Sequence, residues 1–135
     1  AFRLAVGEMA SESVRLRTLR DTLERRLRTG FPELAVNGDP VDRLPHILNV
    51  SFDSSRLRLE GETLVMNMDL RGIAVTSGSA CTSGSMQPSH VLRAMGRDVE
   101  TAKATLRFSF GKSNTAEDIG VVAESLKEVI ARMRK

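Results

Sequence analysis

Residues 105–110 of the sequence read TLRFSF, and the expected fold follows from this pattern. Every second residue in it is a leucine or phenylalanine, and a period of two predicts a strand with one buried face. Residues 48–52 read LNVSF and repeat the alternation. We therefore expect two strands of a small, mainly antiparallel sheet, with Arg107 on the face opposite the apolar residues.

Helical patterns surround these strands. Residues 2–29 contain no proline, and apolar residues recur along them at helical spacing: Met9, Leu16, Leu19, Leu23 and Leu27. At about 1.5 Å per residue this helix is about 40 Å long, with Gly30 as its stop. Shorter helices are expected over residues 62–70 and from Pro88 to Met95, and a final helix from Thr115, with Asp118 at the capping-box position.

The remaining segments predict how these elements are connected. Residues 31–45 hold three of the four prolines and read as loop, and residues 72–76 read as a short strand. The order predicts an α+β fold in which helices pack on one face of the sheet. We expect a single domain over residues 1–135, as the chain length suggests.

Composition excludes several function classes. Twenty basic and seventeen acidic residues give a formal charge of +3, and the two signs interleave along the chain. The chain has no Trp or Tyr and no coherent basic stretch, so we expect no nucleic-acid binding. No apolar run approaches the ~20 residues that span a bilayer, so we expect no membrane insertion. One cysteine, Cys81, and two histidines predict no disulfide, no metal site and a cytoplasmic setting.

The lone cysteine lies in an unusual context. Residues 77–85 read SGSACTSGS, which is too small and polar to pack a core. A lone cysteine is most often a small buried hydrophobe, but this loop predicts an exposed thiol suited to nucleophilic chemistry. Composition alone makes Cys81 a candidate reactive thiol.

The exact sequence of this loop is more specific than its composition. Together with residues 88–96, PSHVLRAMG, it closely resembles the active-site segment of cysteine desulfurases of the NifS/IscS type. These are pyridoxal-phosphate (PLP) enzymes of the class V aminotransferase group. The resemblance spans residues 43–111, through these further segments: RLPH at 43–46, LNVSF at 48–52, EGE at 60–62, GIAV at 72–75 and LRFSFG at 106–111. It departs from the family at Gln87, where an acidic residue is common, and in a longer, more basic stretch at residues 53–59.

The resemblance implies a reaction and assigns residues to it. Cys81 matches the cysteine that takes sulfur from L-cysteine as a persulfide, leaving L-alanine. Arg107 matches the arginine that holds the α-carboxylate of the substrate, and a guanidinium can do this with two parallel hydrogen bonds. The other active-site loop residues are Ser77, Gly78, Ser79, Ala80, Thr82, Ser83 and Gly84. Whether their hydroxyls bond loop backbone or substrate stays open.

The resemblance also implies a cofactor and partners that this chain does not supply. A PLP enzyme needs a lysine for its Schiff base, and none of the four lysines has the family's sequence context. We therefore expect no cofactor-binding residue here, and interpret the chain as the C-terminal small domain. The helix over residues 1–29 then connects it to a large PLP-binding domain that the sequence lacks. The full-length family member implies a homodimer and a sulfur acceptor or iron–sulfur scaffold protein.

Two classes of function stay open at this point. In the first, the chain is part of a cysteine desulfurase and is inactive alone. In the second, it is a non-catalytic persulfide relay or interaction module. His46 and His90 are expected to position backbone or begin a helix, and we assign neither a catalytic role.

Overall fold

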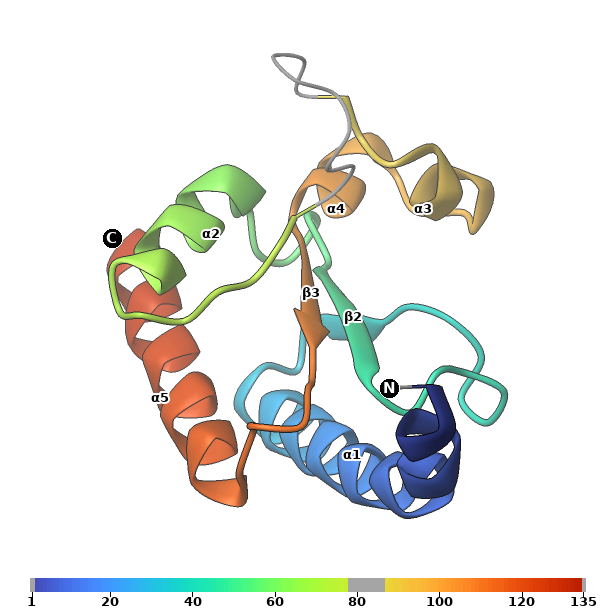
Figure 1. The fold of residues 1–135 in the computed structure, drawn as a ribbon. Helices are drawn as coiled ribbons and strands as arrows, with labels where there is room; N and C mark the ends of the chain where they lie inside the picture. Colours follow the sequence, from blue (N-terminus) through green and yellow to red (C-terminus); the bar gives the residue numbers. More distant parts are fainter. Residues whose placement is uncertain (1, 78–86, 135) are drawn as a thin grey trace.

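The computed structural model describes residues 2–77 and 87–134 (Figure 1). Its elements in chain order are α1 (Phe2–Gly30), β1 (Leu34–Val36), β2 (Ile47–Phe52), α2 (Gly61–Asp69), α3 (His90–Ala94), α4 (Val99–Lys103), β3 (Thr105–Ser109) and α5 (Ala116–Met133). This arrangement confirms the predicted α+β class.

The sheet has three antiparallel strands in the order β1-β2-β3, so β2 is central. Asn49 of β2 lies opposite Arg107 of β3, and Val50 lies opposite Leu106. Because side chains alternate along each strand, this register separates an apolar face from a polar one.

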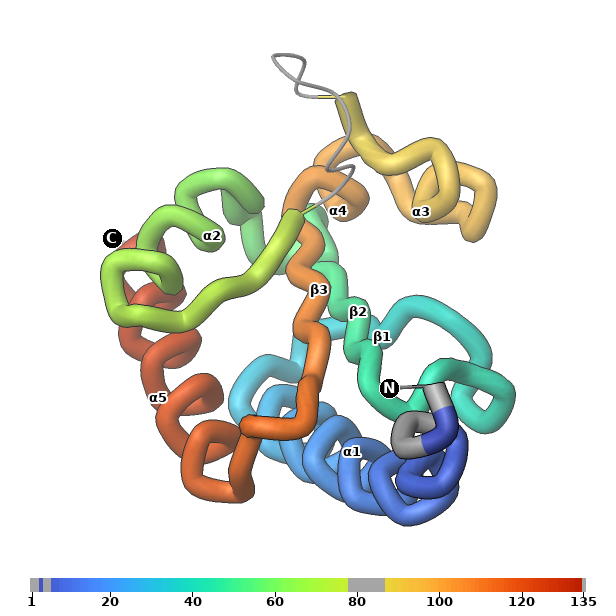
Figure 2. The backbone as a smooth tube through the Cα atoms, in the orientation of Figure 1, coloured from blue at the N-terminus to red at the C-terminus, as the bar shows by residue number. Residues whose placement is uncertain are grey.

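Three helices cover the apolar face. α1 packs against α5, β1 and β2, while α2 packs against α5 and β3. In Figures 1 and 2, α1 passes below the strands, α5 and α2 lie on the left, and α3 and α4 lie beyond the end where β3 begins. Leu48, Val50, Phe52 and Leu106 are fully buried between sheet and helices, as the alternation predicts.

The two long helices form as predicted. α1 is 29 residues long and ends at Gly30, and its buried side chains Leu19, Leu23 and Leu27 lie on the predicted stripe. The Thr115 hydroxyl accepts from the Asp118 amide, and the Asp118 carboxylate accepts from the Thr115 amide, which completes the capping box of α5. Met9 is an exception: it is exposed, because α1 extends past the sheet at its N-terminal end.

Two elements were missed in the sequence. β1 lies inside the stretch predicted as loop, because a three-residue strand between a proline turn and Asn37-Gly38 is too short to show alternation. α4 is a single helical turn that begins after Asp98, whose carboxylate accepts from the Thr101 amide at 2.9 Å. The one indication of this helix in the sequence was Asp98, an aspartate of the type that commonly precedes a helix.

One predicted element is absent and another is shorter than expected. Residues 72–76 form no strand, and only Thr76 pairs with β3, in an isolated bridge to Arg107. α3 begins at His90 and not at Pro88, because the Ser89 hydroxyl caps it. Within the described parts of the chain, no helix has the length and apolar character needed to cross a membrane.

Candidate functional site

Arg107 lies on the open, polar face of the sheet. It is exposed, while its strand neighbours Leu106 and Phe108 are buried on the other face. Both backbone polar groups of Arg107 bond to Thr76: the Arg107 amide donates to the Thr76 oxygen at 2.7 Å, and the Thr76 amide donates to the Arg107 oxygen at 3.3 Å. The guanidinium has no hydrogen-bond or ion-pair partner among residues 2–77 and 87–134, so it is available to an anion.

Thr76 connects this arginine to the loop that carries the predicted nucleophile. Cys81, Gly78, Ser79, Ala80, Thr82, Ser83 and Gly84 lie outside the described residues. Ser77 is described: it is partly exposed and follows directly on the Thr76 bridge. The bridge therefore places the start of the predicted loop beside Arg107.

The start of α2 packs closely against this region. A Cβ on Gly61 would lie 2.1 Å from the Lys103 carbonyl oxygen and 3.3 Å from the Ser77 Cβ. A backbone oxygen at that distance cannot yield without moving β3, which begins two residues later. Only glycine fits here, and this explains the Gly in the 60–62 motif.

Asn37, Asn49 and Arg107 form a row across the three strands. The Asn37 amide nitrogen donates to the Asn49 Oδ1 at 2.6 Å and to the Ser51 hydroxyl at 2.7 Å. Arg97, which precedes α4, donates from Nε to the Asn37 Oδ1 at 2.8 Å. Sequence reasoning missed this network. Its signal was an asparagine on the outward side of a strand, where that residue type is disfavoured.

A second branch of the network returns to α4. The Ser51 and Thr105 hydroxyls lie 2.6 Å apart, and both residues are fully buried. The Thr105 hydroxyl donates to the Thr101 carbonyl oxygen at 3.1 Å. α4 is thus held to the polar face at two points, through Arg97 and through Thr101.

Asp98 stabilises the start of α4 electrostatically. Hydrogen bonds from the Thr101 side chain and backbone, and from the Ser54 hydroxyl, lower the pKa of this carboxyl to about 2. Asp98 is therefore ionised at neutral pH and acts as a permanent cap.

The two histidines lie at the ends of secondary-structure elements. The His46 carbonyl oxygen accepts from the Phe110 amide at 2.8 Å and extends the β2–β3 ladder by one pair. His90 is the first residue of α3 and is exposed. Their placement fits backbone positioning and the start of a helix.

Three of the four lysines are described, and each forms an ion pair on the surface. Lys103, Lys112 and Lys127 form ion pairs with Glu100, Glu8 and Glu124 respectively. Lys103 and Lys127 lie on helices, and Lys112 lies in the turn before α5. Lys135 lies outside the described residues. Those residues also hold no group of three His, Cys, Asp or Glu side chains that could bind a metal ion.

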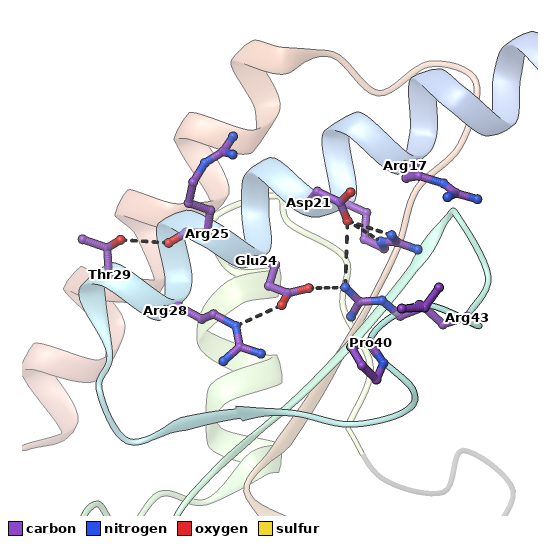
Figure 3. Close-up of a pocket in the computed structure, with 10 residues that line it drawn as sticks. Arg17, Asp21, Glu24, Arg25, Arg28, Thr29, Pro40 and Arg43 are labelled. Carbon is purple, nitrogen blue, oxygen red and sulfur yellow. Dashed lines mark hydrogen bonds and ion pairs between the residues drawn. The ribbon is translucent and has the colours of Figure 1, made fainter.

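A groove of about 570 Å³ lies between α1 and the loop that follows β1 (Figure 3). Its charged lining residues are Arg17, Arg20, Asp21, Glu24, Arg25, Arg28 and Arg43. Arg43 pairs with Glu24 at 2.5 Å and with Asp21 at 3.9 Å, and Arg28 pairs with the same Glu24. Glu24 therefore pairs with both Arg28 and Arg43, and the ion pairs of Arg43 hold α1 to the loop that leads from Asn37 to β2.

Solved structures share this fold. A NifS-like protein from Rickettsia africae aligns with a TM-score of 0.78 and 26% identity, over 93% of this chain and 31% of that chain. DndA from Streptomyces lividans aligns with a TM-score of 0.52 and 40% identity, over 79% of this chain. The fold is therefore that of one part of the NifS-like proteins.

Sequence relatives identify the family. The Aminotransferase class-V profile matches residues 3–122, and the chain belongs to this family. It is 46% identical over 134 residues to a protein of Pseudomonas syringae pv. tomato named cysteine desulfurase IscS, and 46% identical to the protein of that name from Methylococcus capsulatus. It spans about a third of the length of these relatives, namely 31% and 32%. The predicted resemblance is confirmed.

Proposed function

We propose that the chain is the C-terminal part of a cysteine desulfurase, in which Arg107 holds the carboxylate of L-cysteine and Cys81 takes its sulfur. One observation carries the proposal. Arg107 is exposed on the polar face, lacks a partner among the described residues, and is bridged through its backbone to Thr76, immediately before the Cys81 loop. The 46% identity to proteins named cysteine desulfurase IscS supports it.

The chemistry balances as a sulfur transfer. L-cysteine and the Cys81 thiol give L-alanine and a Cys81 persulfide, so the sulfur atom moves and nothing else is consumed. The thiolate is the reactive form of a cysteine. Arg107 fixes one end of the substrate by its carboxylate, and this fixes the direction in which the sulfur lies.

We propose that residues outside this chain hold the PLP that such an enzyme uses, because none of the four lysines has the sequence context that the family gives its Schiff-base lysine. When bound, PLP supplies the electron sink that weakens the carbon–sulfur bond. We propose that Cys81, Arg107 and the remaining loop residues are the contribution of this chain, and that the 135 residues alone are inactive.

The partners follow from the persulfide. A sulfur bound on a loop cysteine must pass to an acceptor thiol or to an iron–sulfur scaffold protein. We propose such a protein as the partner, a homodimer as the form of the full-length enzyme, and the reducing cytoplasm as its setting.

The experiment uses the full-length enzyme and compares wild type, Cys81→Ser and Arg107→Ala. Cys81→Ser is expected to abolish L-alanine release while retaining the PLP absorbance, because the thiol does not hold the cofactor. Ser109→Ala is the matched control, since Ser109 is exposed on the same sheet face without a predicted role. L-alanine release from L-cysteine at the wild-type rate by Cys81→Ser would overturn the proposal.

A further inference from the structure

We propose that Asn49 is a second substrate-binding residue, whose amide NH2 donates to the substrate carboxylate beside Arg107 and is oriented by Arg97 through Asn37. The inference rests on the proposed function and adds a residue to the same site. It stands on the direction of the hydrogen bonds on the polar face of the sheet.

The direction of the network is set at Arg97. A guanidinium can only donate, so the Asn37 atom that it meets at 2.8 Å must be the carbonyl oxygen. The Asn37 NH2 group is then turned the other way, and both of its hydrogens are used, toward the Asn49 Oδ1 and the Ser51 Oγ. Arg97 thereby removes the ambiguity between O and N that an amide otherwise has.

The Ser51 branch agrees with this direction. Ser51 accepts from Asn37, so its own hydroxyl hydrogen is free to donate to Thr105, 2.6 Å away. Thr105 in turn donates to the Thr101 carbonyl oxygen. Each hydroxyl accepts once and donates once, so reversing any bond leaves a buried group unsatisfied.

The Asn49 amide is oriented by the same rule. Its Oδ1 is occupied by the Asn37 NH2, so its own NH2 is turned away from β1. Asn49 and Arg107 are opposite each other in the register, while the backbone bonds of Arg107 go to Thr76. Such a non-hydrogen-bonded pair has its Cα atoms about 4.5 Å apart and its side chains close together.

Two donors of this kind suit one ligand. Asn49 is only partly buried and its NH2 has no acceptor among residues 2–77 and 87–134, while the neighbouring guanidinium also lacks one. A carboxylate has two oxygens and about four acceptor sites, which is enough for Arg107 and an amide NH2 together. An unpaired amide beside an unpaired guanidinium therefore points to the substrate carboxylate.

The test compares L-cysteine with cysteamine, which is L-cysteine without its carboxylate, on the full-length enzyme. Asn49→Ala and Asn49→Ser are expected to raise KM for L-cysteine about 10- to 100-fold, as loss of a hydrogen bond to a charged group does, with kcat little changed. Serine still offers Asn37 an acceptor, so it keeps the network if the alanine variant folds poorly. The inhibition constant of cysteamine is expected to stay within twofold, which a general structural defect would not allow.

Arg97 tests the orientation separately. Arg97→Met is expected to raise KM for L-cysteine several-fold without changing cysteamine inhibition, while Arg97→Lys, which still donates, restores KM. Asn67→Ala is the control, since the Asn67 side-chain amide donates to the Thr63 carbonyl oxygen within α2.

The outcomes separate this inference from the proposed function. If Arg107→Ala raises KM but neither Asn49 variant does, or if cysteamine inhibition weakens in parallel, Asn49 does not bind the carboxylate. If Arg107→Ala leaves KM unchanged, or the wild type does not use L-cysteine, the proposed function itself is wrong and Asn49 loses its role with it.

Discussion

The two faces of the three-stranded sheet are built by alternate residues of the same strands, yet they do different work. One face presents Leu48, Val50 and Leu106 to α1, α2 and α5, and all three are fully buried. The other presents Asn49, Ser51 and Arg107. We expect the apolar face to contribute most of the stability, and the exposed part of the polar face, with the unpaired donors of Arg107, to contribute little. The register alone keeps them apart, since a slip by one residue would exchange them.

The largest effect on stability is expected on the apolar face. Phe52 is fully buried and meets Phe31 edge to face, with ring centroids 5.6 Å apart. Phe52→Ala in this chain should lower the free energy of unfolding by about 3–5 kcal/mol, from lost burial and the cavity left behind. Urea unfolding measures it, with exposed Val121→Ala as the control. A loss below 1 kcal/mol would contradict the view that the apolar face is the main source of stability.

Arg107 should show the opposite behaviour. Arg107→Ala in the full-length enzyme should raise KM for L-cysteine about 30- to 1000-fold, since charge-assisted bidentate bonds contribute about 2–4 kcal/mol. The unfolding free energy of the 135-residue chain should change by less than about 0.5 kcal/mol, as at other exposed positions. Arg107→Lys should recover part of the affinity, because an ammonium cannot reproduce the planar fork. An Arg107→Ala variant that loses stability and keeps its kinetics would assign the arginine a structural role.

The buried part of the polar face lies between these extremes. Ser51→Ala removes the acceptor of an Asn37 hydrogen and the donor to Thr105, and both partners are buried. We expect a loss of about 1–3 kcal/mol in unfolding free energy, the usual cost of leaving such groups unsatisfied. Ser109→Ala, exposed on the same face, should be neutral. Equal effects of the two serine variants would show that the network does not stabilise α4.

The sequence was informative where a pattern repeats and silent where contacts are non-local. Alternation predicted β2 and β3, and with it the face on which Arg107 lies. Leucine spacing predicted α1, and Thr115 with Asp118 predicted the start of α5. β1 is only three residues long, too short for any periodicity, and it exists because Ala35 and Val36 complete the pairing of β2.

The polar network could not be predicted from the sequence, because its contacts are non-local. Arg97 and Asn37 are 60 positions apart, and only the packing of α4 on the sheet brings them together. The sequence motifs of the family predicted Cys81 and Arg107 as site residues, and both assignments stay predictions. The sequence of residues 36–49 by itself does not indicate that Asn37 orients Asn49.

The smallest effect is expected at the cap of α4, and it depends on pH. Asp98→Ala should lower the unfolding free energy at pH 7 by about 1 kcal/mol, the usual effect of losing an N-cap. Hydrogen bonds from Thr101 and Ser54 lower the pKa of Asp98 to about 2, whereas the pKa of an aspartate in the unfolded chain is about 3.9. A lowered pKa means that the cap contributes fully above about pH 4 and loses its contribution as pH falls toward 2.

The difference in unfolding free energy between wild type and Asp98→Ala should therefore be constant from pH 7 to about 4.5 and should decrease below that pH. Asp98→Asn caps without titrating, so its stability relative to Asp98→Ala should not change with pH over this range. If this difference instead increases at low pH, the protonated carboxyl of Asp98 stabilises the fold more than the carboxylate does, which would contradict its role as a charged cap.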